Sequence, residues 1–180
     1  MKWTTVAVSL AVVASLLGGC GSGGGSSSAT TAASIPAADV ARQTREADAI
    51  CKRMVVDAHR LGREATSRDP SAYGDTLDFT TEALIAPAVP VVERSARELR
   101  AVRGTGGVPQ LDAYVAMFDP ILSLLVERVR AGRRGDSQQA HEIEEQLIEF
   151  GGIQKTLAKE AGLKACTVDL IGSFASRSSG

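Results

Sequence analysis

From residue 40 onward, apolar and small side chains recur along the chain in steps of four and three residues. Side chains at this spacing lie on one face of an α-helix, so the pattern predicts a first helix of about seven turns. Aromatic residues make up only 4% of the chain. The core must therefore consist mainly of Leu, Val, Ile and Ala, which suits packed helices better than a sheet. The first stripe consists of Val40, Thr44, Ala47, Cys51, Met54, Ala58, Leu61 and Ala65.

Three further segments show the same periodicity and begin at residues that favour helix starts. Asp69 and Pro70 suit the cap and first position of the second helix, and Pro109 suits the start of the third. Asp136 followed by Gln139 resembles a capping box at the start of the fourth. Turns and the last helix end are expected at residues 104–107, Gly132, Gly135 and Gly162. The expected inward faces are Leu77, Leu84, Ala88, Val91, Leu99 and Val102; then Leu111, Tyr114, Val115, Phe118, Leu122 and Leu125; and finally Ala140, Ile143, Leu147, Phe150, Leu157 and Ala161.

Short connections between long helices favour antiparallel neighbours. The sequence therefore predicts an all-α domain over residues 37–180, folded as an up-down-up-down antiparallel four-helix bundle. Pro87, Pro90 and Pro120 each remove a backbone donor and crowd the preceding turn, so we expect kinked or restarted helices there.

The expected bends and the Gly151–Gly152 pair fall near one height of such a bundle. Bends at one level either pack against each other or open a waist that could hold an apolar ligand. We expect the packed arrangement and keep the open pocket as the alternative. The side chains at this level are Leu84, Val91, Phe118, Leu122, Leu147 and Phe150.

The first residues combine one cation, Lys2, with an apolar run over residues 6–17. A helix of about a dozen residues rises roughly 18 Å, which is short of the ~30 Å hydrocarbon core of a bilayer. The sequence therefore predicts a signal peptide over residues 1–19 and not a transmembrane helix.

The apolar run ends in a motif that resembles the lipobox of bacterial lipoproteins, Leu17-Gly18-Gly19-Cys20. This resemblance implies cleavage before Cys20 and transfer of a diacylglyceryl group, with palmitate among its acyl chains, to the Cys20 thiol. The alternative is an ordinary signal peptide that leaves Cys20 free. Residues 20–36 follow as a Gly, Ser, Ala and Thr segment with few apolar side chains, which predicts a flexible tether between the lipid and the domain.

Two cysteines, Cys51 and Cys166, remain beyond Cys20. An even pair in an exported chain is most simply a disulfide, which here requires the chain to turn at Gly162 and to return along the bundle. The alternative is a buried Cys51 with a free Cys166. The returning tail is expected to dock and to cover apolar surface with Val168, Leu170 and Ile171.

Metal and cofactor chemistry finds little support in the sequence. Di-iron helical bundles use Glu-x-x-His motifs, but Gln138 stands where the carboxylate before His141 would be needed. His59 lies beside the first apolar stripe, where a packed or half-exposed imidazole is common. We therefore expect no metal site and no cofactor.

The charged clusters have simple structural interpretations. Glu142, Glu145 and Glu149 share one helix face, which is typical of a solvated surface. A formal net charge of −1 provides no surface for nucleic acid. A run of arginines fits the preference for cations at a helix C-terminus and consists of Arg128, Arg130, Arg133 and Arg134.

Catalytic motifs are missing: there is no Gly-x-Ser-x-Gly, no haem-attachment motif and no phosphate loop. The combination of lipobox, tether, helices and paired cysteines resembles small helical lipoproteins of actinobacteria, a group without a known activity to transfer. This resemblance implies a protein lipid-anchored to the cell membrane and facing outside the cytoplasm. We expect a non-catalytic interaction module for an envelope or surface protein, with a small apolar-ligand carrier as the alternative.

Overall fold

Each amphipathic stripe of the sequence forms a helix in the computed structural model, which describes residues 35–68, 77–102 and 108–167. No strand occurs among these residues, and the expected all-α helical bundle is confirmed. The elements are α1 (Ala37–Arg68), α2 (Leu77–Phe79), η1 (Thr80–Ile85), α3 (Ala86–Val102), α4 (Pro109–Ala116), α5 (Phe118–Arg133), α6 (Ser137–Glu160) and η2 (Ala165–Thr167).

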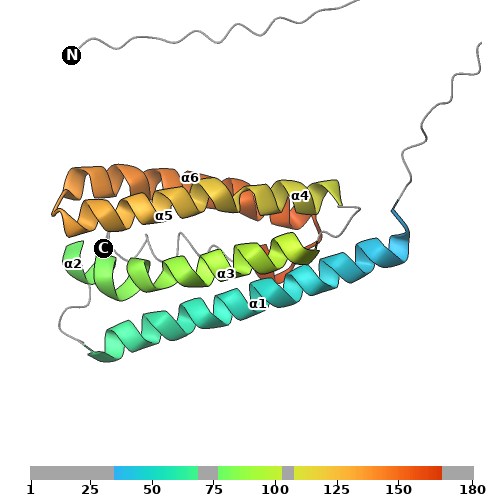
Figure 1. Ribbon diagram of the computed structural model, residues 1–180, viewed down its shortest axis with the longest axis horizontal. Helices are drawn as coiled ribbons and strands as arrows, with labels where there is room; N and C mark the ends of the chain where they lie inside the picture. Colours follow the sequence, from blue (N-terminus) through green and yellow to red (C-terminus); the bar gives the residue numbers. More distant parts are fainter. Residues whose placement is uncertain (1–34, 69–76, 103–107, 168–180) are drawn as a thin grey trace, which may run out of the picture. The chain divides into compact units, whose positions relative to one another are not determined.

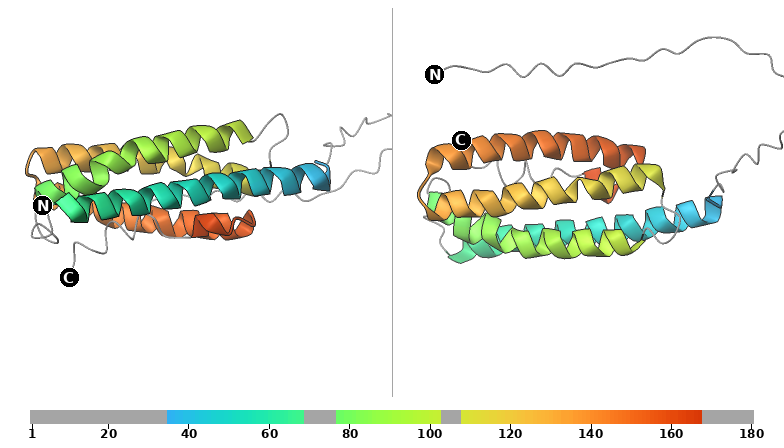
Figure 2. Two further views of the ribbon diagram at one scale, coloured as in Figure 1. Left: turned by 90° about the horizontal axis from the view of Figure 1, so that it is seen from below. Right: turned by 45° about the horizontal axis from the view of Figure 1, so that its top comes forward.

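The long helices lie side by side and run in alternating directions along the chain (Figure 1). Helix α1 packs against α3, α3 against α5, and α5 against α6, while α4 also packs on α6. The short helix η2 contacts both α1 and α6 and so joins the first and last long helices. Figure 2 shows the same arrangement from two further sides. The segment that follows α6, up to Thr167, is therefore a structural part of the bundle.

The core consists of two clusters that together extend along the bundle. One joins α1, α3 and α4 to the end of α6 and the residues after it, and the other joins η1, α5 and the first half of α6. On α1 the predicted stripe faces this core, with Ile50 and Gln43 buried beside it. The largest apolar side chains with at most 1% exposure are Tyr114, Phe118, Leu99, Leu111, Ile121 and Leu163.

The prolines of the second segment, where we expected a kink or a restart, do not end the helix. Residues 77–102 form one helical run in which η1 is a π-helix that leads directly into α3. At their junction, the Ala86 amide donates to the carbonyl of Thr81, five residues earlier. A proline ring clashes with the carbonyl four residues before it, and wider turns relieve such crowding without ending the helix. Pro87 follows this π-helix, which contains the carbonyl of Ala83 that its ring would crowd, whereas Pro90 lies inside the α-helix α3.

The third segment is interrupted, as predicted, but at Met117 and not at Pro120 itself. Pro120 has no amide hydrogen to donate to the carbonyl of Ala116. The Met117 amide instead bonds the carbonyl of Tyr114 at 3.3 Å in a tighter turn. By contrast, the Gly151–Gly152 pair lies within the continuous helix α6, so that pair does not break its helix.

The predicted cap of the fourth helix is confirmed, because the Gln139 amide donates to Asp136 Oδ1 at 3.0 Å. The turn before it uses Gly135, whose φ of 71° is the left-handed conformation that glycine adopts without strain. There the Asp136 amide bonds the Ala131 carbonyl at 3.0 Å, which satisfies the end of α5 in a Schellman motif. The helix start expected at Asp69–Pro70 and the turn at residues 104–107 lie outside the described residues.

Candidate functional site

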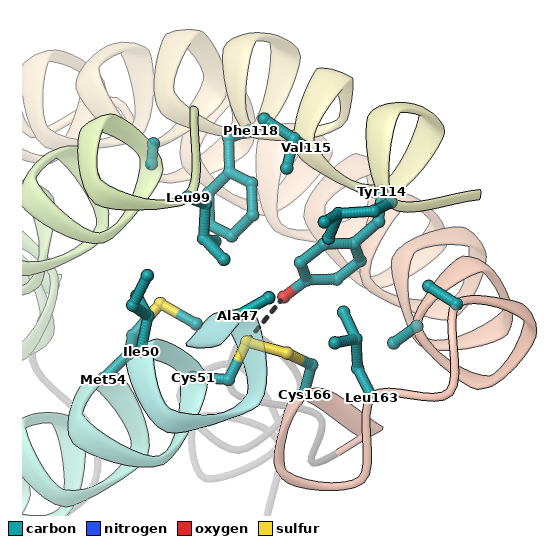
Figure 3. Packing of buried hydrophobic residues seen from close by; sticks show 14 of the residues in the cluster. Ala47, Ile50, Cys51, Met54, Leu99, Tyr114, Val115, Phe118, Leu163 and Cys166 are labelled. Carbon is teal, nitrogen blue, oxygen red and sulfur yellow. Dashed lines mark hydrogen bonds between the residues drawn. A yellow bond between two sulfur atoms is a disulfide. The ribbon is translucent and has the colours of Figure 1, made fainter. Parts of the chain in front are cut away.

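The structure pairs the two cysteines that remain beyond Cys20. Cys51 in α1 and Cys166 in η2 are separated by 115 residues in sequence, yet their Cα atoms lie 5.2 Å apart and their sulfur atoms at disulfide distance (Figure 3). Cys51 is 0% exposed and Cys166 is 6% exposed. The predicted pairing is therefore found, and the arrangement with a free Cys166 is not.

The chain reaches this position by the turn that the sequence predicts at Gly162. Gly162 has a φ of 72°, and the Leu163 amide reaches back to the Ala158 carbonyl at 2.8 Å in a second Schellman motif. Leu163 is then buried, and the Ala165 amide donates to Asp48 Oδ1 at 2.7 Å. The Schellman motif, the burial of Leu163 and the bond to Asp48 thus hold the returning segment against the bundle. The tail residues expected to cover apolar surface, Val168, Leu170 and Ile171, lie outside the described residues.

Tyr114 covers the disulfide from the side of α4. Its hydroxyl lies 3.4 Å from Cys51 Sγ, and its ring meets Phe118 edge to face with centroids 5.5 Å apart (Figure 3). Burial, and secondarily the charge of Asp48, raises the pKa of Tyr114 above its ordinary value. The phenol therefore keeps its proton at neutral pH and serves as a packed side chain and not as a base.

The six side chains expected at the waist are divided between the two core clusters. Val91 and Phe118 belong to the first cluster, with Leu122 packed against it; Leu147 belongs to the second, with Leu84 and Phe150 packed against it. Phe118 is 1% exposed and Leu147 is 3% exposed. Val91, Phe118 and Leu147 are buried in these two clusters, whereas Leu84, Leu122 and Phe150 are half-buried at their edges.

A solvent-open groove lies instead on the outer face between α3 and α5. It encloses about 520 Å³, and of the six waist residues it includes only Leu122. Val89, Leu122 and Val126 are half-buried apolar lining residues. Its polar lining consists of Glu93, Ser123, Glu127 and Arg130. The apolar periodicity of the third segment predicted that Leu122 faces the core, but no feature of the sequence indicates the distance between α3 and α5.

One arginine of the run that we interpreted as a helix C-terminal preference is buried. Arg128 is 2% exposed, and its Nε and Nη2 donate to Glu144 Oε1 at 2.8 and 2.6 Å. Its Nη1 donates to Thr81 Oγ1 at 3.0 Å, and Thr81 in turn donates to the Leu77 carbonyl at 2.6 Å. This buried polar network, Thr81, Arg128 and Glu144, joins η1, α5 and α6.

Gly132, whose carbonyl accepts the Gly135 amide at 2.9 Å in the turn after α5, also takes part in this contact. A Cβ atom at Gly132 would lie 2.7 Å from Thr81 Cγ2 and 2.8 Å from Thr81 Cβ. Gly132→Ala should therefore displace Thr81 and weaken its bond to Arg128. Overpacking of this kind typically costs about 1–3 kcal/mol, more than the ~1 kcal/mol that alanine gains in helix propensity. We expect the free energy of unfolding, measured by urea titration, to fall by up to about 2 kcal/mol.

Gly152 provides the matched control, because it is exposed within α6 and nothing lies within 4 Å of its Cβ position. Gly152→Ala should raise the free energy of unfolding by up to ~1 kcal/mol, since only helix propensity changes. The same sign for both variants would contradict the close approach of Gly132 to Thr81.

The remaining charged candidates lie on the surface. His141 and Glu145 are exposed, with Nε2 and Oε1 3.5 Å apart, and Glu142 accepts a bond from Gln138 at 3.1 Å. Glu149 and His59 are exposed as well. In the part of the chain that the structure describes, no three His, Cys, Asp or Glu side chains form a group that could hold a metal ion.

The other arginines of the run differ from Arg128. Arg133 donates to Glu82 at 2.6 Å, and this bond lowers the pKa of Glu82; Arg134 donates to Gln139, also at 2.6 Å. Both arginines are exposed near the end of α5, as the sequence predicts. Arg130 is exposed too and lines the groove.

The lipobox residues Leu17, Gly18, Gly19 and Cys20 lie outside the described residues. Within the described ranges, no helix combines the length and the apolar character needed to cross a bilayer. No protein-family model, no curated protein and no solved structure matches the chain. The inference of function therefore depends on the residues and on their geometry.

Proposed function

We propose that this chain is a lipoprotein anchored through Cys20 on the outer side of the cell membrane, and that its helical domain is a non-catalytic interaction module. The Cys51–Cys166 pair carries this proposal. Disulfides persist in oxidising compartments and are rare in the cytoplasm. The pair therefore supports export by an observation that is independent of the lipobox motif.

The groove between α3 and α5 favours an interaction module over a carrier. A site for a small apolar ligand encloses most of its ligand, typically about 70–90% of the ligand surface. The groove is open to solvent and combines apolar lining residues with the charged side chains Glu93, Glu127 and Arg130. Apolar centres with polar rims are typical of protein–protein contacts. The carrier, our alternative from the sequence, is therefore the second proposal.

The chemistry of the buried groups agrees with a protein that binds and does not catalyse. Both thiols beyond Cys20 are in the disulfide, and Tyr114 keeps its proton. His59 and His141 are exposed on the surface. With a formal charge of −1, the chain has no electrostatic basis for nucleic-acid binding. The proposed partners are the membrane, through the lipid, and an envelope or surface protein.

Substitution of Cys20 tests the anchor. In host cells labelled with a palmitate analogue, the chain should take up label and sediment with the membranes. Cys20→Ala should abolish the labelling, because alanine offers no thiol for the acyl group. Ser22→Ala, two residues further along the tether, is the matched control and should label like the wild type. Undiminished labelling of Cys20→Ala would refute the proposal.

A further inference from the structure

Two unpaired charges of opposite sign lie in the groove between α3 and α5. Glu127 and Arg130 are three residues apart on α5, so they share one helix face. Within the described residues, neither forms an ion pair or side-chain hydrogen bond, whereas Glu93 across the groove accepts a bond from Arg97 at 2.9 Å. Among the residues that the structure describes, the lining of the groove therefore offers one free anion and one free cation beside half-buried apolar side chains.

We propose that a second copy of this chain occupies the groove. In a twofold dimer, residue i of one copy meets residue j of the other, and j meets i. If α5 packs antiparallel to its counterpart, Glu127 of each copy faces Arg130 of the other. Both free charges are then paired, while Val126 and Leu122 are shielded from water. The pattern of charges is thus complementary to itself.

Other occupants fit the groove less well. Its charged side chains, Glu93, Glu127 and Arg130, sum to −1, which disfavours an anionic lipid surface. An apolar small molecule would remain largely exposed in an open groove. A different protein would need its own pair of charges in matching register, whereas a second copy supplies that pair by symmetry.

The proposed dimer is a weak one, because exposed ion pairs contribute little to the free energy of association. The inference deepens the proposed function, since a common lipid anchor would hold copies in one leaflet and raise their effective concentration. Its test does not depend on the anchor: the dimer is measured in detergent solution, and anchoring is measured by membrane fractionation.

Charge reversal tests the inference on the full chain purified in detergent, with the mass of the complex measured by sedimentation. The wild type should pass from monomer to dimer over the micromolar range. Glu127→Arg alone and Arg130→Glu alone should each weaken the dimer on the order of tenfold, because like charges then meet twice. An equimolar mixture of these two variants should form a mixed dimer, and the double variant should recover the wild-type behaviour.

The mixture also excludes loss of fold as the cause, since a misfolded variant would not recover on mixing. Val126→Lys in the groove should weaken the dimer, whereas Val56→Lys, at an exposed valine of α1, should not. A wild type that stays monomeric throughout the range would overturn the inference. Single variants that dimerise like the wild type, or a mixture that stays monomeric, would overturn it as well.

Discussion

Replacing Cys51 and Cys166 together by alanine is expected to lower the free energy of unfolding by about 4–5 kcal/mol. The two residues are 115 positions apart, so their bond closes most of the described domain into one loop. Cross-linking of so long a loop removes much conformational entropy from the unfolded chain, and the double variant regains that entropy. Urea titration of the wild type and the variant, each by the same probe, measures the difference.

A reductant supplies the control for this prediction. The wild type measured with dithiothreitol should approach the stability of the double variant, whereas the double variant itself should not respond. A loss below about 1 kcal/mol would mean that the disulfide does not constrain the unfolded chain as loop-closure entropy requires.

Glu144→Ala is expected to cost about 3–5 kcal/mol, because it leaves the guanidinium of Arg128 buried without its carboxylate. Arg128 is 2% exposed, and its guanidinium donates to Glu144 through two nitrogens and to Thr81 through the third. Thermal or urea unfolding should show the loss at neutral pH.

Two matched variants define the cause of that loss. Glu145→Ala, at the exposed neighbouring position on α6, should change the free energy of unfolding by no more than about 0.5 kcal/mol. Replacing both partners, as Arg128→Met with Glu144→Leu, should recover most of the loss, because an apolar pair leaves no buried charge. An equal loss in the single and double variants would contradict the role of the unpaired guanidinium.

The helices and their inward faces could be predicted because each face repeats over several turns. The buried residues of α1 follow the predicted steps of four and three, and the cap at Asp136 forms as its spacing indicates. The disulfide could be predicted from the number of cysteines in an exported chain, and the turn at Gly162 makes it geometrically feasible.

Arg128 shows where a local pattern misleads. In the sequence it belongs to a run of arginines that we interpreted as the cations favoured at a helix C-terminus. Yet it follows Ile121 and Leu125 at steps of four and three, so it occupies the inward face of α5. The helical periodicity of α5 therefore indicated that Arg128 faces inward. The Glu144 carboxylate and the Thr81 hydroxyl that stabilise its buried guanidinium are brought together only by the fold.

The groove could not be derived from the sequence, because it depends on how far two helices separate. Thr81 approaches Gly132 closely at one end, and this contact sets the spacing of η1 and α5. Further along, the half-buried side chains Val89, Leu122 and Val126 leave the groove between α3 and α5 open. Spacing of this kind follows from side-chain packing across helices and not from the period of one helix.

The most direct test of the account is the mass of the N-terminal peptide of the chain purified from host membranes. Lipid anchoring predicts a peptide that begins at Cys20 and carries the additional mass of a diacylglyceryl group. The same peptide should gain no mass on thiol alkylation, because its only thiol is joined to the glyceryl group as a thioether. A peptide that begins before Cys20, or one whose Cys20 is alkylated as a free thiol, would contradict the proposed lipoprotein.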